Sequence, residues 1–241
     1  MCSNYRAVTR SDRMLTFFGI ERAKDEDPID VWPTGLAPFI RLAEPGSGNK
    51  LVVEDGLFGL LPSFQKEMAA GRKTYNARTE TVAKLPSYRD SWRKGLRCII
   101  PAESIYEPNY ESGKAVRWWI QRAGGIPMGI AGIYSEWEDP ATGIKKFTFS
   151  MLTVNADDHP FMKRFHAPNE EKRMVVILDP SEYDSWLSCP VNEAPNFFKQ
   201  WQGELEGWPA ALPPRVAKPK APPVAKPPPP PPPPPETGSL F

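Results

Sequence analysis

Residues 97–107 read RCIIPAESIYE, two largely apolar blocks on either side of a single proline. The β-branched and aromatic residues predict a strand at 97–100, a turn at Pro101 and a second strand that ends at Glu107. The apolar block before Pro101 should be buried, so Cys98 is expected to be an inert core thiol. We therefore expect a chain built from short strands joined by turns.

Five more segments are rich in β-branched and aromatic residues and are bounded by Gly, Pro, Asn or Asp. They lie at 51–60, 116–122, 128–134, 147–154 and 174–178. Helix signals are fewer: a cap at Ser87 opens a short helix that Gly95 stops, and Asp179 precedes another at 180–187. Strands in this number, without regular βαβ alternation, predict an α+β fold, a single, mainly antiparallel β domain with a few short helices.

The composition changes abruptly toward the C-terminus. Fifteen of the 30 prolines fall in 209–241, and nine of them are consecutive, at 227–235. Such a segment cannot form a packed core and is expected to be a disordered polyproline II spacer. We therefore divide the chain into a folded domain at 1–208 and a proline-rich tail at 209–241. The tail ends in Leu240-Phe241, which resembles the end of a sliding-clamp-binding peptide without its usual glutamine.

The composition also argues against several classes of protein. Hydrophobic residues make up 40% of the 241 positions, and no apolar run approaches the roughly 18 residues of a membrane span. The N-terminal segment lacks the apolar core of a secretory signal and three cysteines form no disulfide framework, so a cytoplasmic protein is expected. Nothing in the sequence suggests an obligate oligomer, so we expect a monomer. With two histidines, no Gly-rich phosphate loop and no HExxH or GxSxG motif, we expect neither a metal nor a cofactor.

Positive charge gathers in one stretch, although the net charge is only +1. Residues 72–97 contain eight Lys and Arg against two Asp and Glu, a local excess of six. Such a stretch is commonly a solvated basic face. It is also what a protein needs to follow a phosphate backbone, and the stretch alone leaves both interpretations open.

Cys2 directly follows the first methionine. If Met1 is removed, residue 2 carries a primary amine and a thiol on adjacent carbons, a pair that no internal cysteine offers. The amine condenses with an aldehyde to a Schiff base, and the thiol then closes a five-membered thiazolidine ring. Because a terminal amine titrates near ~7.7–8.0 and a lysine near ~10.4, the terminus is much the better-populated neutral amine at neutral pH.

Three further groups are candidates for binding phosphate or transferring protons. The segment 76–81, Asn-Ala-Arg-Thr-Glu-Thr, joins an amide to an arginine fork suited to phosphate, but it could equally cap a helix. Glu107 closes a predicted strand, where a carboxylate at a pocket rim could shuttle protons. Two imidazoles, His159 and His166, follow the strand at 147–154, and their spacing does not choose between them.

Several separated segments together resemble one family, the SOS-response-associated peptidase (SRAP) or abasic-site processing proteins. The resemblance covers essentially all of 1–190. Its pieces are Met1-Cys2, 76–81, Tyr88-Arg89-Asp90, 97–102, Tyr106-Glu107, 152–156, His166 and Arg173-Met174. The family's compact His-x-Arg-Met-Pro is stretched here, from His166 through to Arg173-Met174-Val175.

The resemblance implies an enzyme of the DNA-damage (SOS) response that senses abasic sites in single-stranded DNA, at the nucleoid or replication fork. It implies that Cys2 captures the exposed aldehyde as a thiazolidine DNA–protein crosslink. It further implies strand-cleaving (AP-lyase) activity through the same Schiff base, and a peptidase activity that chiefly removes Met1.

The resemblance also implies roles for single residues. Asn76 would orient the terminal cysteine or the opened sugar, and Glu107 would be the acid–base in Schiff-base formation and reversal. His166 would assist sugar ring opening, with His159 as the reserve. The implied contacts with the DNA backbone are Arg6, Arg78, Arg89 and Thr153.

Two other functions stay open. An N-terminal-cysteine amidohydrolase or peptidase would use the Cys2 thiolate as its nucleophile on an amide bond and would need no DNA. A non-catalytic, replication-associated binding module would dock a partner through its tail, and replacing Cys2 would then change nothing. The basic stretch at 72–97 favours DNA over an amide substrate.

Overall fold

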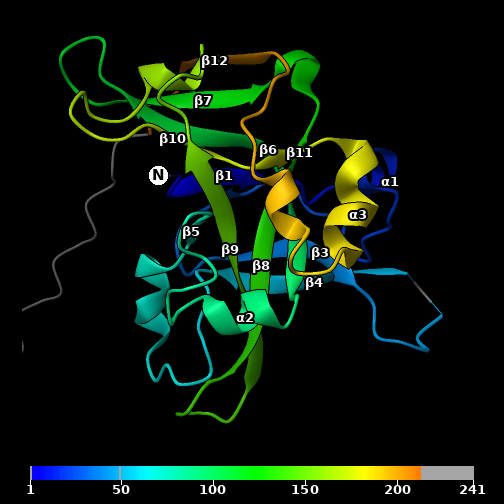
Figure 1. Ribbon diagram of the computed structural model, residues 1–241. Helices are drawn as coiled ribbons and strands as arrows, with labels where there is room; N and C mark the ends of the chain where they lie inside the picture. The colour runs from blue at the N-terminus through cyan, green and yellow to red at the C-terminus, as the bar shows by residue number, and fades with distance from the viewer. Residues whose placement is uncertain (1, 49, 213–241) are drawn as a thin grey trace, which may run out of the picture. The chain divides into compact units, whose positions relative to one another are not determined.

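Strand β6 (Arg97–Asn109) runs through the middle of the sheet in the computed structural model (Figure 1). It is one continuous strand, so the turn predicted at Pro101 is wrong. The proline is tolerated because it lies at a gap between partner strands along one edge of β6. On that edge β3 (Leu36–Leu42) pairs with β6 at Ile99 and β1 (Asn4–Ala7), which has a bulge there, pairs from Ala102 on, while β8 (Met128–Glu138) pairs with the opposite edge from Arg97 to Ala102.

Within the described residues, 2–48 and 50–212, twelve strands form one sheet. Its order is β11-β8-β9-β4-β3-β6-β1-β2, and an additional β8–β6 pairing closes the sheet on itself. Only β4 and β5 run parallel to a neighbour, β9, so the predicted α+β, mainly antiparallel fold is confirmed. The other strands are β2 (Asp30–Val31), β4 (Leu51–Phe58), β5 (Asn76–Arg78), β7 (Val116–Arg122), β9 (Lys145–Asn155), β10 (Arg173–Val175), β11 (Ile177–Leu178) and β12 (Leu205–Pro209).

The helices are short. α2 (Arg89–Arg93) and α3 (Tyr183–Ser188) match the two predicted helices, although α2 begins without the side-chain cap predicted from Ser87. Asp179 caps the turn that leads into α3, as predicted. α1 (Ser11–Phe18) was not predicted. Five 3-10 turns complete the described secondary structure: η1 (Met68–Lys73), η2 (Ala123–Gly125), η3 (Met162–Arg164), η4 (Pro180–Glu182) and η5 (Ala194–Phe197).

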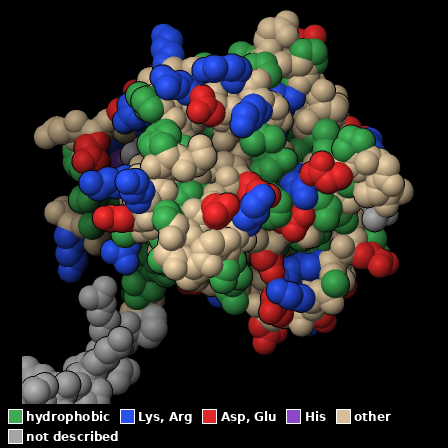
Figure 2. Space-filling model, turned by 90° about the horizontal axis from the view of Figure 1, so that it is seen from below, with side chains coloured by type: hydrophobic (Ala, Val, Ile, Leu, Met, Phe, Trp, Pro, Cys, Tyr) green, Lys and Arg blue, Asp and Glu red, His purple; other side chains and the backbone are tan. Residues whose placement is uncertain are grey.

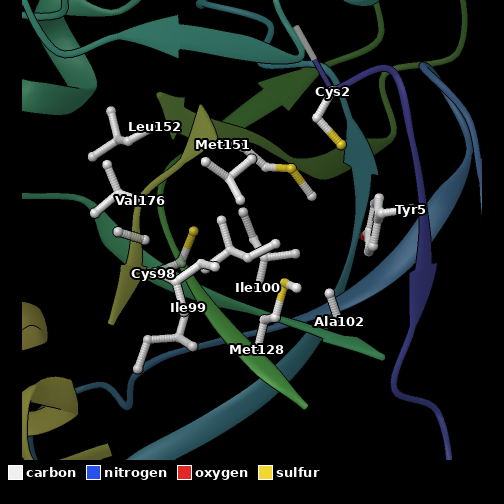
Figure 3. Close-up of a cluster of buried hydrophobic side chains, with 14 of the residues drawn as sticks. Cys2, Tyr5, Cys98, Ile99, Ile100, Ala102, Met128, Met151, Leu152 and Val176 are labelled. Carbon is white, nitrogen blue, oxygen red and sulfur yellow. The ribbon is translucent and has the colours of Figure 1, made fainter. Parts of the chain in front are cut away.

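The hydrophobic core includes the N-terminus of the chain. Phe149 packs against Phe39 and Phe58, with ring centroids 5.5 and 5.7 Å apart. Cys98 is fully buried, as predicted. Cys2 belongs to the same cluster, and Figure 3 shows it at one end with its sulfur pointing inward. The fold therefore holds residue 2 in place from both the thiol side and, as described below, the backbone side.

The structure describes little of the proline-rich tail. Residues Met1–Ala211 group into one unit, while the tail from 213 on, with Leu240-Phe241, lies outside the described residues. The division into 1–208 and 209–241 therefore stays a prediction. Among the described helices, none has the length and apolar character needed to cross a membrane.

Candidate active site around Cys2

Cys2 lies just ahead of β1 and is only 1% exposed. Its thiol donates a hydrogen bond to the Asn4 carbonyl at 3.3 Å. Burial raises the pKa of the Cys2 thiol, and the nearby Glu107 carboxylate raises it further.

Asn76 anchors the main chain of Cys2. Strand β5 carries this residue beside Met151 of β9, and its side-chain Nδ2 donates to the Cys2 carbonyl oxygen at 2.7 Å. The Tyr88 hydroxyl in turn donates to the Asn76 main-chain oxygen at 2.9 Å. All three residues are buried. This chain of contacts fixes the direction in which residue 2 enters the site.

Glu107 and His166 form a buried pair. The His166 Nε2 lies 3.0 Å from Glu107 Oε2, and their side chains are 4% and 1% exposed. His166 has φ of 65°, a left-handed conformation that costs a non-glycine residue about 1–3 kcal/mol. Its backbone N–H donates to the Pro108 carbonyl at 2.8 Å, which holds it there. Imidazoles and carboxylates are the side chains that most often act as general acids and bases, and here the two lie buried side by side.

Both ring nitrogens of the other histidine, His159, contact main-chain groups. Its Nδ1 accepts hydrogen bonds from the backbone N–H groups of Phe161 and Met162, both at 3.1 Å. Its Nε2 lies 2.9 Å from the Trp201 carbonyl oxygen. Both ring nitrogens thus serve the local fold, and the structure places His166 rather than His159 beside Glu107.

The four predicted DNA-backbone contacts differ in accessibility. Arg78 and Arg89 are exposed, and Arg78 projects from the same side of β5 as Asn76 because strand side chains alternate. Arg6 is partly exposed and pairs with Asp30 at 3.2 Å. Thr153 is not on the surface: it is 1% exposed, and its hydroxyl accepts a hydrogen bond from a buried arginine.

The basic stretch is less continuous than its sequence indicated. Arg97 is buried and donates to the carbonyls of Trp186 and Cys189, so it holds α3 instead of facing solvent. The exposed cations of the stretch are Arg72, Lys73, Arg78, Lys84, Arg89, Arg93 and Lys94. Figure 2 shows the face seen from below, where Lys and Arg side chains are interspersed with Asp and Glu.

Several residues that shape the site had no predicted role. Tyr88 was noted only within a matching segment, yet its hydroxyl supports Asn76. Trp118 stands opposite Glu107 in the β6–β7 register and packs edge-on against Phe165, next to His166. Strand alternation could have placed Trp118 in the core, but only the strand register shows that it lies opposite Glu107.

The chain is similar in sequence and in structure to several known proteins. Abasic site processing protein YoaM of Bacillus subtilis is 28% identical over 204 residues, covering 83% of this chain and 84% of that protein. Abasic site processing protein HMCES of Gallus gallus is 28% identical over 177 residues, covering 63% and 50%. A crystal structure of a Bordetella bronchiseptica protein matches with a TM-score of 0.79 and 36% identity, over 88% of this chain and all of that one.

The family model for SOS response associated peptidase (SRAP) matches residues 1–211, nearly the whole described chain. The resemblance predicted from separated segments is thereby confirmed. The chain belongs to the SRAP family.

Proposed function

We propose that this protein captures abasic sites in single-stranded DNA through a covalent bond to Cys2. The observation that carries the proposal is the setting of residue 2, whose carbonyl is held by Asn76 and whose thiol lies near Glu107 and its partner His166. The names of the relatives, abasic site processing proteins, support the substrate class.

The chemistry needs the amine that removal of Met1 exposes, and we include that removal in the proposal as the peptidase activity. The amine attacks the aldehyde carbon of the ring-opened deoxyribose and forms a carbinolamine, which loses water to give an imine. The thiol sulfur then bonds to the imine carbon while the thiol proton passes to nitrogen. One water leaves overall, and no oxidant or reductant is required.

Proton transfer is the proposed task of the buried pair. Opening the sugar, dehydrating the carbinolamine and reversing the crosslink each move a proton at the reacting carbon, oxygen or nitrogen. Glu107 lies near the Cys2 thiol, and His166 Nε2 lies 3.0 Å from Glu107 Oε2. The same imine would permit strand cleavage, because loss of a proton from the adjacent sugar carbon expels the 3′ phosphate.

The burial of the Cys2 thiol favours aldehyde capture over the amidase alternative. A cysteine hydrolase needs a thiolate nucleophile, whereas burial raises the pKa of this thiol. Ring closure needs only the thiol and an imine. The exposed cations Arg78 and Arg89 would bind the phosphates that flank the lesion.

The test compares the parent protein and Cys2→Ser on single-stranded DNA with one abasic site. The parent should form an adduct that survives denaturation. Cys2→Ser keeps the amine but lacks the ring-closing thiol, so strand cleavage should persist while the stable adduct disappears. DNA with a tetrahydrofuran in place of the abasic sugar has no aldehyde and is the matched control. A durable crosslink from Cys2→Ser, or from the tetrahydrofuran DNA, would rule out the thiazolidine.

A further inference from the structure

Glu171 joins two arginines of different character. It lies in the loop between His166 and β10, where the sequence is longer than the compact family pattern. Its Oε1 accepts a hydrogen bond from Arg173 Nη1 at 2.7 Å, and its Oε2 accepts one from Arg78 Nη1 at 2.8 Å. One carboxylate thus ties an exposed arginine near the site to a buried one.

Arg173 is a rigid anchor for this carboxylate. Its side chain is 2% exposed and forms two parallel hydrogen bonds with Glu80, both of 3.0 Å. It also donates to the Thr153 carbonyl at 2.6 Å. Bidentate arginine–carboxylate pairs have a fixed geometry. Glu171 therefore stays near Arg173 even when its contact with Arg78 breaks.

Arg78 is the exposed partner. Its side chain is 46% exposed, and it projects from the same side of β5 as Asn76, whose side chain holds Cys2. A phosphate next to a captured sugar would bind the Arg78 guanidinium, and that group already holds a carboxylate. Both ligands are anionic oxygens that suit the same planar fork.

We propose that Glu171 competes with the DNA backbone for Arg78 and thereby lowers the affinity of the protein for single-stranded DNA. The inference rests on the proposed binding of DNA phosphates by Arg78. Hydrogen bonding from Arg173 lowers the pKa of Glu171, so the competing carboxylate is ionised at neutral pH. A phosphate must displace Glu171, which Arg173 then keeps nearby as a repelling charge.

The test is non-covalent binding of an undamaged single-stranded oligonucleotide, measured by fluorescence anisotropy at two salt concentrations. Glu171→Gln should bind about three- to tenfold more tightly than the parent, because it removes an ion pair of modest strength and a like-charge repulsion. Glu170→Gln is the matched control, since Glu170 is exposed in the same loop and changes the net charge equally. It should tighten binding less than about twofold, by bulk electrostatics alone.

A double substitution tests whether Glu171 acts through Arg78. In an Arg78→Gln background, Glu171→Gln should give no more gain than Glu170→Gln, because the competed arginine is gone. Equal binding by the Glu171 and Glu170 variants, or weaker binding by Glu171→Gln, would overturn the inference and leave the proposed function standing. A parent protein that binds no single-stranded DNA and forms no adduct would instead overturn the proposed function.

Discussion

Replacing Asn76 with Ala tests whether the position of the Cys2 terminus limits capture of the aldehyde. The substitution removes the 2.7 Å hydrogen bond from Asn76 Nδ2 to the Cys2 carbonyl, in a place where both residues are buried. A buried carbonyl that loses its donor costs about 1–3 kcal/mol. Because the bond holds only Cys2, just ahead of β1, most of this cost should appear as undocking of the terminus.

The magnitude follows from that energy. About 2 kcal/mol lowers the equilibrium constant for docking of the terminus roughly 30-fold, since each 1.4 kcal/mol is tenfold. The rate of adduct formation falls by the same factor when the undocked state predominates in the variant. We therefore expect Asn76→Ala to form the adduct about 10- to 100-fold more slowly at saturating DNA, with affinity for DNA changed less than about twofold. Single-turnover crosslinking, followed on denaturing gels with protein in excess, measures this rate.

Tyr88→Phe is the matched control. It removes a hydrogen bond from the same buried chain, the 2.9 Å bond to the Asn76 main-chain oxygen, but leaves the Asn76 side chain on Cys2. It should slow the reaction less than about fivefold, because it removes one neutral hydrogen bond that supports Cys2 only through Asn76. An Asn76→Ala protein that crosslinks at the parent rate, or no more slowly than Tyr88→Phe, would refute the reasoning.

Three more perturbations test other parts of the molecule. Glu107→Gln should slow reversal of the crosslink about 100-fold, while the affinity for DNA stays within about twofold of the parent. Reversal is measured by the exchange of the adduct onto fresh DNA, and an unchanged rate would exclude Glu107 from acid–base chemistry. Arg173→Met should lower the free energy of unfolding by about 2 kcal/mol in urea titrations, because the buried Thr153 carbonyl and hydroxyl lose the donor that Arg173 supplies; a loss below about 1 kcal/mol would contradict the role of Arg173 as an anchor. Burial opposes ionisation of Asp55, yet hydrogen bonds from Lys24 and Arg22 keep its pKa below the usual value. Stability from a depressed acid is lost as pH falls, so the melting temperature should drop below about pH 5 and Asp55→Asn should flatten that drop; equal slopes would exclude this role.

The strand pattern could be predicted because β-branched and aromatic residues mark strands locally. Val116–Arg122 was predicted to the residue. The continuity of β6 through Pro101 could not be predicted, because it depends on partner strands that are distant in the sequence, β8 on one edge and β3 and β1 on the other. α1 was missed although its limits carry local signals, Ser11 at the start and a left-handed Gly19 at the end.

In the site, too, features that depend on local sequence could be predicted, and features that depend on contacts between distant residues could not. The chemistry of Cys2 follows from its position, and the resemblance picked out Glu107 and His166, which the fold brings to 3.0 Å. Burial of Thr153 and Arg97 could not be predicted from local sequence, since their partners lie 20 and about 90 residues away. A Lys or Arg within a basic stretch of sequence can therefore be buried, and only the structure shows whether it is exposed.

The most direct test of covalent capture is the intact mass of the protein after reaction with a short single-stranded oligonucleotide that carries one abasic site. The account predicts the mass of the chain without Met1, plus the oligonucleotide, minus one water, stable to denaturation and absent for Cys2→Ala. A chain that keeps Met1 and still forms the adduct, or an equal adduct on Cys2→Ala, would contradict capture by the Cys2 aminothiol.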